Sequence, residues 1–302
     1  MNPNELTLEE FAAALSPGSR MIDAESAEGR RLRRTIARGL VHLTLREVIR
    51  AVQSGHRGRR AGEVQQYYQH WYKEEPLEVI KSYGRPGRAI PFRFGSEHIA
   101  ITDARYPLRL ITERLGKIIA AQNPREVCEV GCGHGRNLFY LANRMPSIEF
   151  SGYELSAAAV NVAQRLQQLD LPCTEYGRLY RLENSTMDNV RRIRFEQASA
   201  FKLPAADESF DLVFTSAALE QMQDGLDDAL AEIRRVARRH VLLYEPFGDY
   251  NDSLGRLYLW SRNYFRLRTS DLARHGLRVV RIWRSLPVKP TFAYAFALCE
   301  RA

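Results

Sequence analysis

A chain of 302 residues suffices for one large domain, or for one domain with a substantial appendage. Its 45% hydrophobic and 26% charged residues are typical of a globular protein with a full core, and no apolar run approaches the roughly eighteen residues of a membrane span. The net charge of +8 invites a nucleic-acid interpretation, but the basic residues are almost all arginine, a bias that a GC-rich genome also produces.

The first third of the chain, residues 1–107, is expected to form a cap of helices and loops. Thr7 and Glu10 form a capping box, which predicts a helix that begins at Leu8. The basic run at 29–40 has apolar residues at helical spacing, and its arginines form either a solvated helix face or a patch for an anionic partner. Segment 83–98 holds two prolines and three glycines, so we expect it to be mostly loop.

From residue 108 onward, strand-like and helix-like segments alternate, and two strands without an intervening helix finish the chain. This order predicts an α/β fold with a doubly wound, seven-stranded, mainly parallel sheet over residues 108–302, beneath the N-terminal helical cap. Insertions are expected at 171–193 and 247–269. The segments expected to be strands are 126–130, 148–155, 193–199, 210–219, 240–246, 277–286 and 292–301. A ligand of such a sheet lies beyond the carboxyl ends of its strands.

The stretch "EVCEVGCGHGRN" is expected to place a glycine turn between the first of these strands and a helix. In a dinucleotide-binding G-x-G-x-x-G turn, the third glycine would stand at Arg136, whereas here it arrives one residue earlier. Alone, the pattern is also compatible with a turn that only packs helix on sheet. Glu129 before the turn and Glu154 at the end of the second strand favour a nucleoside, because a carboxylate can accept hydrogen bonds from both ribose hydroxyls.

In this ordered set of motifs the chain resembles the class I S-adenosylmethionine-dependent methyltransferases, from about Leu108 to the end. The resemblance implies S-adenosylmethionine as cofactor, with Glu129 at its amino group and Glu154 at its ribose. Ser199 departs from the pattern, because the family usually has an aspartate there for the adenine amino group. Ala200 would offer a backbone donor and Phe201 a stacking surface. The complete cofactor set implied is Glu129, Gly131, Gly133, Gly135, Asn137, Glu154, Leu155, Ser199, Ala200 and Phe201.

Methyl transfer from a sulfonium is an in-line displacement, which needs positioning more than a dedicated dyad of acid and base. Candidate catalytic residues come from their places after the strands: Glu220 and Gln221 after the fourth strand, and Tyr250 at the start of the second insertion. Glu220 is either a base or a helix cap, and Glu245 is either a base or the partner of an arginine.

Two groups of aromatic residues, at 67–72 and 258–265, form either core beneath a lid or a box around a sulfonium or a flat substrate. Histidines 70 and 98 lack partners at metal-ligand spacing, and no metal site is expected. His134 lies within the glycine turn, where its ring either points away from the cofactor or lines the pocket rim.

These observations favour a methyltransferase for a small-molecule substrate, with secondary metabolism as its setting. The alternatives are an enzyme that cyclises the aminobutyrate group of S-adenosylmethionine and releases methylthioadenosine, an RNA or protein methyltransferase, and a cofactor-binding scaffold without activity. A nucleic-acid partner is disfavoured, because "TSAALEQM" stands where a base methyltransferase would have its N-P-P-Y motif. No membrane partner is expected, and a homodimer stays open. The N-terminus is unlike a secretory signal and the four cysteines lack a disulfide framework, so we expect a cytoplasmic protein.

Overall fold

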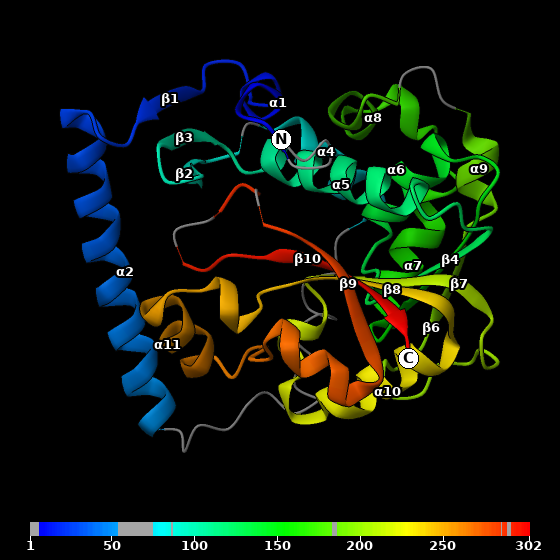
Figure 1. The fold of residues 1–302 in the computed structure, drawn as a ribbon. Coiled ribbons are helices and arrows are strands. Elements are labelled where there is room, and N and C mark those ends of the chain that lie inside the picture. The colour runs from blue at the N-terminus through cyan, green and yellow to red at the C-terminus, as the bar shows by residue number, and fades with distance from the viewer. Residues whose placement is uncertain (1–5, 54–74, 86, 183–185, 285, 289–290) are drawn as a thin grey trace.

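The computed structural model describes residues 6–53, 75–85, 87–182, 186–284, 286–288 and 291–302. At its centre lies a seven-stranded sheet in the order β6-β5-β4-β7-β8-β10-β9 (Figure 1). Its strands are β4 (Glu126–Val130), β5 (Glu149–Glu154), β6 (Arg194–Gln197), β7 (Phe210–Ser216), β8 (Ala237–Glu245), β9 (Leu277–Trp283) and β10 (Ala295–Arg301). The first five are parallel, and β10 is antiparallel to both β8 and β9. The predicted doubly wound, seven-stranded, mainly parallel sheet is confirmed.

Helices cover both faces of this sheet (Figure 1), since its strands carry apolar side chains on both sides. Along β7, Leu212 and Phe214 face one core and Val213 faces the other. The first core is completed by helices that include α5, α6 and α7, and the second by α10. The helices are α5 (Arg105–Ala120), α6 (Arg136–Arg144), α7 (Ala157–Leu166) and α10 (Leu226–Val236), with the short turns η2 (Leu219–Gln221) and η3 (Gln223–Gly225) before α10.

The N-terminal region contains a second sheet besides its helices. Its elements are α1 (Leu8–Ala13), β1 (Arg20–Asp23), α2 (Ala27–Gln53), α4 (Pro76–Gly84), β2 (Ala89–Phe94) and β3 (His98–Asp103), and the strands form an antiparallel sheet in the order β1-β3-β2. The expectation that 83–98 is mostly loop is therefore wrong for β2. Pro91 is tolerated because β2 lies at the edge of this sheet, where a missing N–H leaves no strand partner unpaired. The predicted capping box is confirmed: Glu10 N donates to Thr7 Oγ1 over 3.1 Å, and Thr7 N to Glu10 Oε2 over 3.0 Å.

Both predicted insertions contain short helices. The segment 171–193 includes η1 (Leu171–Cys173), α8 (Glu175–Tyr180) and α9 (Met187–Arg191), and the segment 247–269 includes η4 (Gly248–Tyr250) and α11 (Ser253–Ser261), after which η5 (Thr269–His275) leads into β9. Tyr176 and Tyr180 are buried and contact rings of α6, so the first insertion packs on the sheet's helical layer. Helix α11 lies against α2 (Figure 1). Among the described helices, none has the length and apolarity needed to cross a bilayer.

Candidate functional site

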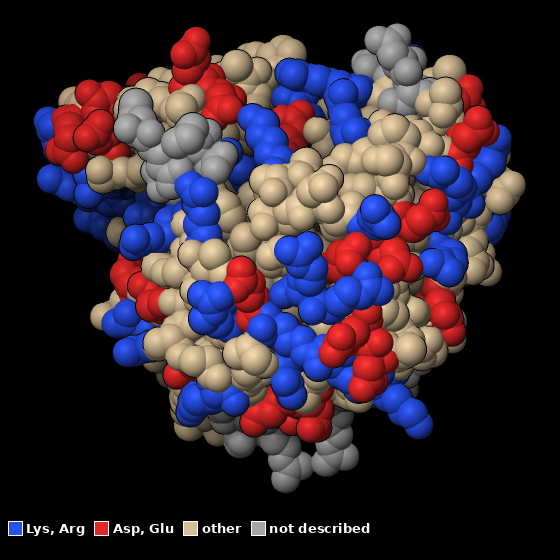
Figure 2. Space-filling model, turned by 45° about the vertical axis from the view of Figure 1, so that its right-hand side comes forward, with Lys and Arg blue, Asp and Glu red and all other residues tan. Residues whose placement is uncertain are grey.

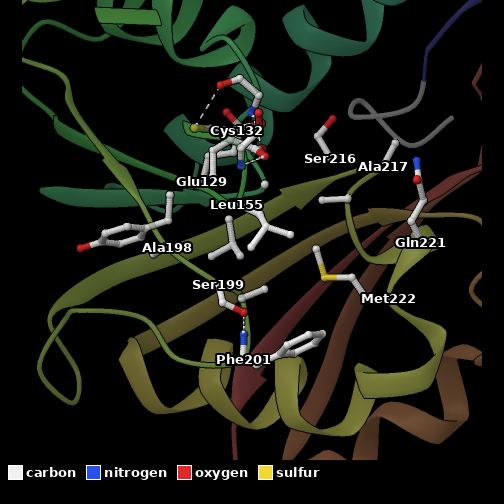
Figure 3. A pocket seen from close by; sticks show the side chains of 18 of the residues that line it. Glu129, Cys132, Leu155, Ala198, Ser199, Phe201, Ser216, Ala217, Gln221 and Met222 are labelled. Carbon is white, nitrogen blue, oxygen red and sulfur yellow. Dashed lines mark hydrogen bonds between the residues drawn. The ribbon is translucent and has the colours of Figure 1, made fainter. Parts of the chain in front are cut away.

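A cavity of about 590 Å³ opens where the carboxyl ends of β4, β5 and β7 meet the segment after β6 (Figure 3). This is the point at which the chain order of the strands reverses, because β4 lies between β5 and β7. The cavity brings together every residue of the predicted cofactor set except Gly135. Its lining is formed by residues 129–134, 136–137, 153–156, 198–201, 216–218, 221–222, 224–225 and 228.

The glycine turn between β4 and α6 has a backbone that only glycine adopts without strain. Gly131, Gly133 and Gly135 have φ angles of +77°, +55° and +85°. A Cβ atom on Gly131 would lie 2.5 Å from the Cβ of Ala218, and one on Gly135 would lie 2.5 Å from the ring of Phe195. Gly135 therefore serves packing behind the turn, whereas Gly131 keeps the turn close to the opposite wall of the cavity.

Glu129 is buried, with 1% of its surface exposed, and its Oε2 has no hydrogen-bond partner among the described residues. Asn137 Nδ2 donates to its Oε1 over 2.7 Å, and Thr112 Oγ1 donates to Asn137 Oδ1 over 3.0 Å, so a chain of two hydrogen bonds orients the carboxyl group. Burial raises the pKa of Glu129 to about 8, against the lowering effects of the Asn137 hydrogen bond and the Arg136 charge. A cationic group in the cavity would supply the missing partner of Oε2 and favour the ionised form.

Glu154 forms the wall of the cavity next to the glycine turn. Its Oε2 accepts from Gly133 N over 3.0 Å and its Oε1 from Ser156 N over 2.9 Å. Burial raises the pKa of Glu154, whereas these two backbone hydrogen bonds lower it. Each carboxylate oxygen can accept more than one hydrogen bond, so this fixed group retains the capacity to bind a diol. Leu155 lines the cavity beside it.

The segment after β6 closes the other end of the cavity (Figure 3). Ser199 Oγ accepts from Phe201 N over 3.2 Å, which fixes the turn that also contains Ala200. The ring of Phe201 lies against Gly225, where a Cβ atom would come within 2.8 Å of it. No carboxylate comes from this turn, but Asp228 of α10 lines the same cavity. Sequence reasoning missed Asp228, since the turn and α10 are joined only by the fold.

The three predicted catalytic residues lie in different surroundings. The described lining of the cavity includes Gln221 and neither Glu220 nor Tyr250. The Glu220 carboxylate accepts a hydrogen bond of 2.5 Å from the hydroxyl group of Tyr294, which sequence reasoning did not single out. Tyr250 packs beside the second core, and the guanidinium group of Arg284 lies 5.0 Å from the centre of its ring.

Glu245, considered above as a base or as the partner of an arginine, braces the loop after β7. Its Oε1 accepts from Thr215 Oγ1 over 2.9 Å and from the backbone N–H groups of Ala218 and Leu219 over 3.1 Å each. Burial and the nearby Glu220 raise the pKa of Glu245 to about 8. Its partners thus hold the cavity wall that faces the glycine turn.

The histidine and the aromatic group near the site differ in role. His134 lines the cavity, and burial together with the Arg136 charge lowers its pKa to about 4, so the ring is neutral near pH 7.

Phe265 is fully buried in the second core, as expected of packing, whereas Tyr258 and Tyr264 contact the ring of Phe292. The aromatic group at 67–72, with His70, lies outside the described residues. Within the described part of the chain, no three His, Cys, Asp or Glu side chains are grouped so as to hold a metal.

Comparison with known proteins agrees with this geometry. Residues 128–244, from β4 through β8, match a family model described as a methyltransferase domain. The matched segment is that of a methyltransferase domain, in agreement with the predicted resemblance to the class I S-adenosylmethionine-dependent methyltransferases. Among solved structures, the [4+2]-cyclase SpnF is similar in fold, with a TM-score of 0.53 and 16% identity over 81% of this chain and 97% of that one.

Two further similar proteins carry methyltransferase names. Magnesium protoporphyrin IX methyltransferase from Synechocystis PCC 6803, solved with bound S-adenosylmethionine, has a TM-score of 0.47 and 14% identity over 65% of this chain and 80% of that one. The fatty-acid O-methyltransferase of Mycolicibacterium smegmatis is 27% identical over 114 residues, which are 38% of this chain and 34% of that protein. The chain thus spans about a third of the length of this curated relative.

The cofactor of this family is S-adenosylmethionine, and the residues present fit it. The free oxygen of Glu129 suits an ammonium group, the carboxylate of Glu154 suits a ribose diol, and Gly131, which lines the cavity, has no side chain that would clash with the opposite wall at Ala218. The volume of about 590 Å³ lies in the usual range of small-molecule sites.

Proposed function

We propose that this chain transfers the methyl group of S-adenosylmethionine to a small molecule, in secondary metabolism and in the cytoplasm. The observation that carries the proposal is the cavity in which the unpaired oxygen of Glu129 and the fixed carboxylate of Glu154 flank the glycine turn. Similar proteins support a small acceptor: their names specify fatty acids, magnesium protoporphyrin IX and geranyl diphosphate. Four free cysteines are compatible with a reducing compartment.

In this proposal, the chain's own residues mainly bind and orient. Glu129 binds the cofactor's amino group, with its direction set by Asn137 and Thr112. Glu154 binds the ribose hydroxyls, and the turn at 198–201 contacts the base. The bound cofactor supplies a methyl group on a positively charged sulfur, ready for in-line displacement by the acceptor. Orientation of this kind contributes most of the rate in a displacement that needs no covalent enzyme intermediate.

The methyl acceptor is proposed to bind along the loop after β7. Gln221 lines the cavity and would orient the acceptor by hydrogen bonding. Glu220, next in the chain, would accept the proton that an O–H or N–H acceptor loses, with the Tyr294 hydroxyl group holding its carboxylate in place. Tyr250, at the start of the insertion 247–269, would shape the entrance for the acceptor.

The test is to incubate the purified chain with S-adenosylmethionine, first alone and then with a cell extract, and to identify the nucleoside products by mass spectrometry. We expect S-adenosylhomocysteine to form only with extract, together with a methylated small molecule. Methylthioadenosine accumulating without a second substrate would overturn the proposal. Methylated RNA or protein as the sole product would replace the small-molecule acceptor by a macromolecule.

A second candidate is a reaction on this fold without methyl transfer. The likeness in fold to a [4+2]-cyclase, over 81% of this chain, supports this second candidate, because that protein is named for a cyclisation. Cyclisation of the cofactor's aminobutyrate group would release methylthioadenosine, and a cyclase that retains its cofactor would release neither nucleoside product. The same incubation separates both outcomes from methyl transfer. Lack of cofactor binding would indicate a scaffold without activity.

A further inference from the structure

Helix α2 carries one continuous line of side chains that the cofactor site does not use. The positions follow one another at spacings of three or four residues, which places them on one face of a helix. This line, the outer seam of α2, consists of Arg31, Arg34, Arg38, Val41, Leu45, Ile49 and Val52. Its first half is basic and its second half is aliphatic.

The outer seam faces away from the rest of the described molecule. The exposed fractions of Val41, Leu45, Ile49 and Val52 are 44%, 54%, 55% and 68%. On the opposite side of the helix, Thr44, Glu47 and Ala51 are buried, and α11 packs along α2 there. Figure 1 shows α2 at the edge of the molecule with α11 on one side of it.

The basic half of the seam is available for a partner. Arg31, Arg34 and Arg38 are exposed and form no ion pair with any described residue, unlike Arg33, which pairs with Glu25 over 2.5 Å. At the left-hand edge of Figure 2, the side on which Figure 1 places α2, Lys and Arg side chains lie beside a group of acidic side chains. A partner of this face must therefore accept positive charge and aliphatic side chains along a single line.

Three kinds of partner can be compared by what they explain. A nucleic acid would explain the arginines but would leave four aliphatic side chains unused. A second copy would explain the aliphatic side chains, but a parallel pair of seams would bring arginines together and an antiparallel pair would set them against aliphatic groups. An anionic bilayer explains both halves, because acidic headgroups attract arginine while aliphatic side chains enter the boundary of the acyl chains.

We propose that the outer seam of α2 docks on the surface of an anionic lipid bilayer. The helix lies along the interface, so docking needs no membrane span, and its arginines would in any case oppose one. This contact goes beyond the proposed reaction and would add a membrane surface to the expected partners. Each arginine near an anionic surface strengthens binding about fivefold.

The experiment measures flotation of the full chain with phosphatidylglycerol-containing vesicles and with pure phosphatidylcholine vesicles. We expect binding to the anionic vesicles only, weakening as salt is added. The combined change Arg31→Gln, Arg34→Gln and Arg38→Gln should weaken binding at least tenfold, and Leu45→Ser with Ile49→Ser should weaken it at least fivefold. Circular dichroism and cofactor binding should be unchanged in both variants, which separates this proposal from the proposed reaction.

Matched controls change the same residue types elsewhere on the surface. The control for charge is Arg88→Gln with Arg194→Gln and Arg239→Gln, all exposed and outside any ion pair between described residues. The control for aliphatic surface is Val280→Ser on β9, where the side chain is 48% exposed. Both should float like the parent chain.

Equal binding to neutral vesicles, no binding to either kind of vesicle, or an equal loss of binding in the control variants would overturn the proposal. A dimer that Leu45→Ser with Ile49→Ser dissociates, or RNA binding that only the arginine variant loses, would replace the bilayer by that partner.

Discussion

Glu129 lies at the carboxyl end of β4, where burial raises its pKa to about 8 and only one of its oxygens has a hydrogen-bond partner. Because the raised pKa means that folding favours the protonated form, the contribution of Glu129 to the unfolding free energy is fully present below the unfolded pKa of about 4.5. That contribution is lost as the pH rises through about 8. Replacing Glu129 by glutamine, which resembles the protonated group, should therefore stabilise the free chain at higher pH. We expect a difference of about 2–4 kcal/mol in unfolding free energy to develop between about pH 5 and about pH 8.

The same Glu129→Gln change should weaken cofactor binding about tenfold or more, because a charged partner of the amino group is lost. Urea unfolding at both pH values without cofactor measures the first effect, and titration calorimetry measures the second. Glu149→Gln, at the exposed amino end of β5, is the control and should change neither. A difference in unfolding free energy that does not vary with pH would show that Glu129 is already ionised in the free chain.

At the scale of elements, the sequence predicted those features in which local pattern and fold agree. The seven strands of the main sheet were predicted because turn or helix signals bound each of them and most are short apolar segments, whereas β6 has a single apolar residue, Phe195. The glycine turn was predicted because three alternate glycines stand between a strand-like and a helix-like segment, and all three have positive φ angles. The edge strand β2 was missed because Pro91 and its flanking glycines also have the composition of a loop.

The remaining parts of the site could not be predicted because their partners are far apart in sequence. Thr112 and Asn137 are 25 residues apart, and Glu220 and Tyr294 are 74 residues apart. The first pair meets because α5 packs on α6. The second pair meets because the segment that leads into β10 lies beside the loop after β7. Glu245 could be noticed as a carboxylate at the end of a strand, but its role as a brace depends on backbone N–H groups that carry no sequence signal.

A buried carboxylate, Glu47, joins α2 to the end of α11. Glu47 pairs with Arg50 over 2.6 Å and with Arg262 over 3.1 Å, and lies 3.5 Å from Arg46. Burial raises the pKa of Glu47, but the Arg262 hydrogen bond and the three positive charges outweigh that effect and hold it below its usual value. Because the pKa is lowered, folding favours the ionised form of Glu47. Its contribution to the unfolding free energy is present above about pH 4.5 and is lost as the pH falls through the folded-state pKa.

We therefore expect Glu47→Gln to lower the unfolding free energy by about 1–3 kcal/mol near pH 7, and by less in acid. Denaturant unfolding over a series of pH values measures this. Glu28→Gln, on the same helix, removes an exposed pair with Arg20 of β1 and should cost at most about 0.5 kcal/mol. Equal losses for the two variants at neutral pH would show that the buried pair adds nothing beyond surface electrostatics.

For the whole molecule, the question is whether the proposed cap, 1–107, and the α/β domain, 108–302, unfold separately. The cap has a small core of its own, which includes Phe11 and Phe92. It is also tied to the larger domain, because Ile80 of α4 belongs to the main core and the buried Arg109 donates to the carbonyl oxygen atoms of Ala14 and Leu179. These cross-connections favour one cooperative unit.

We therefore expect a single thermal transition that S-adenosylmethionine shifts as a whole. At a concentration one hundred times the dissociation constant, binding adds about 2.7 kcal/mol, which for a chain of this size raises Tm by roughly 5 °C. Glu154→Ala should weaken binding at least tenfold through loss of the ribose contact, and so reduce the shift at the same concentration to about half or less. Glu149→Ala, on the other end of β5, should keep the full shift. Scanning calorimetry with and without cofactor measures all three chains. Two transitions, of which only one moves with cofactor, would mean that the cap is an independent unit, and an undiminished shift in Glu154→Ala would mean that the ribose binds elsewhere.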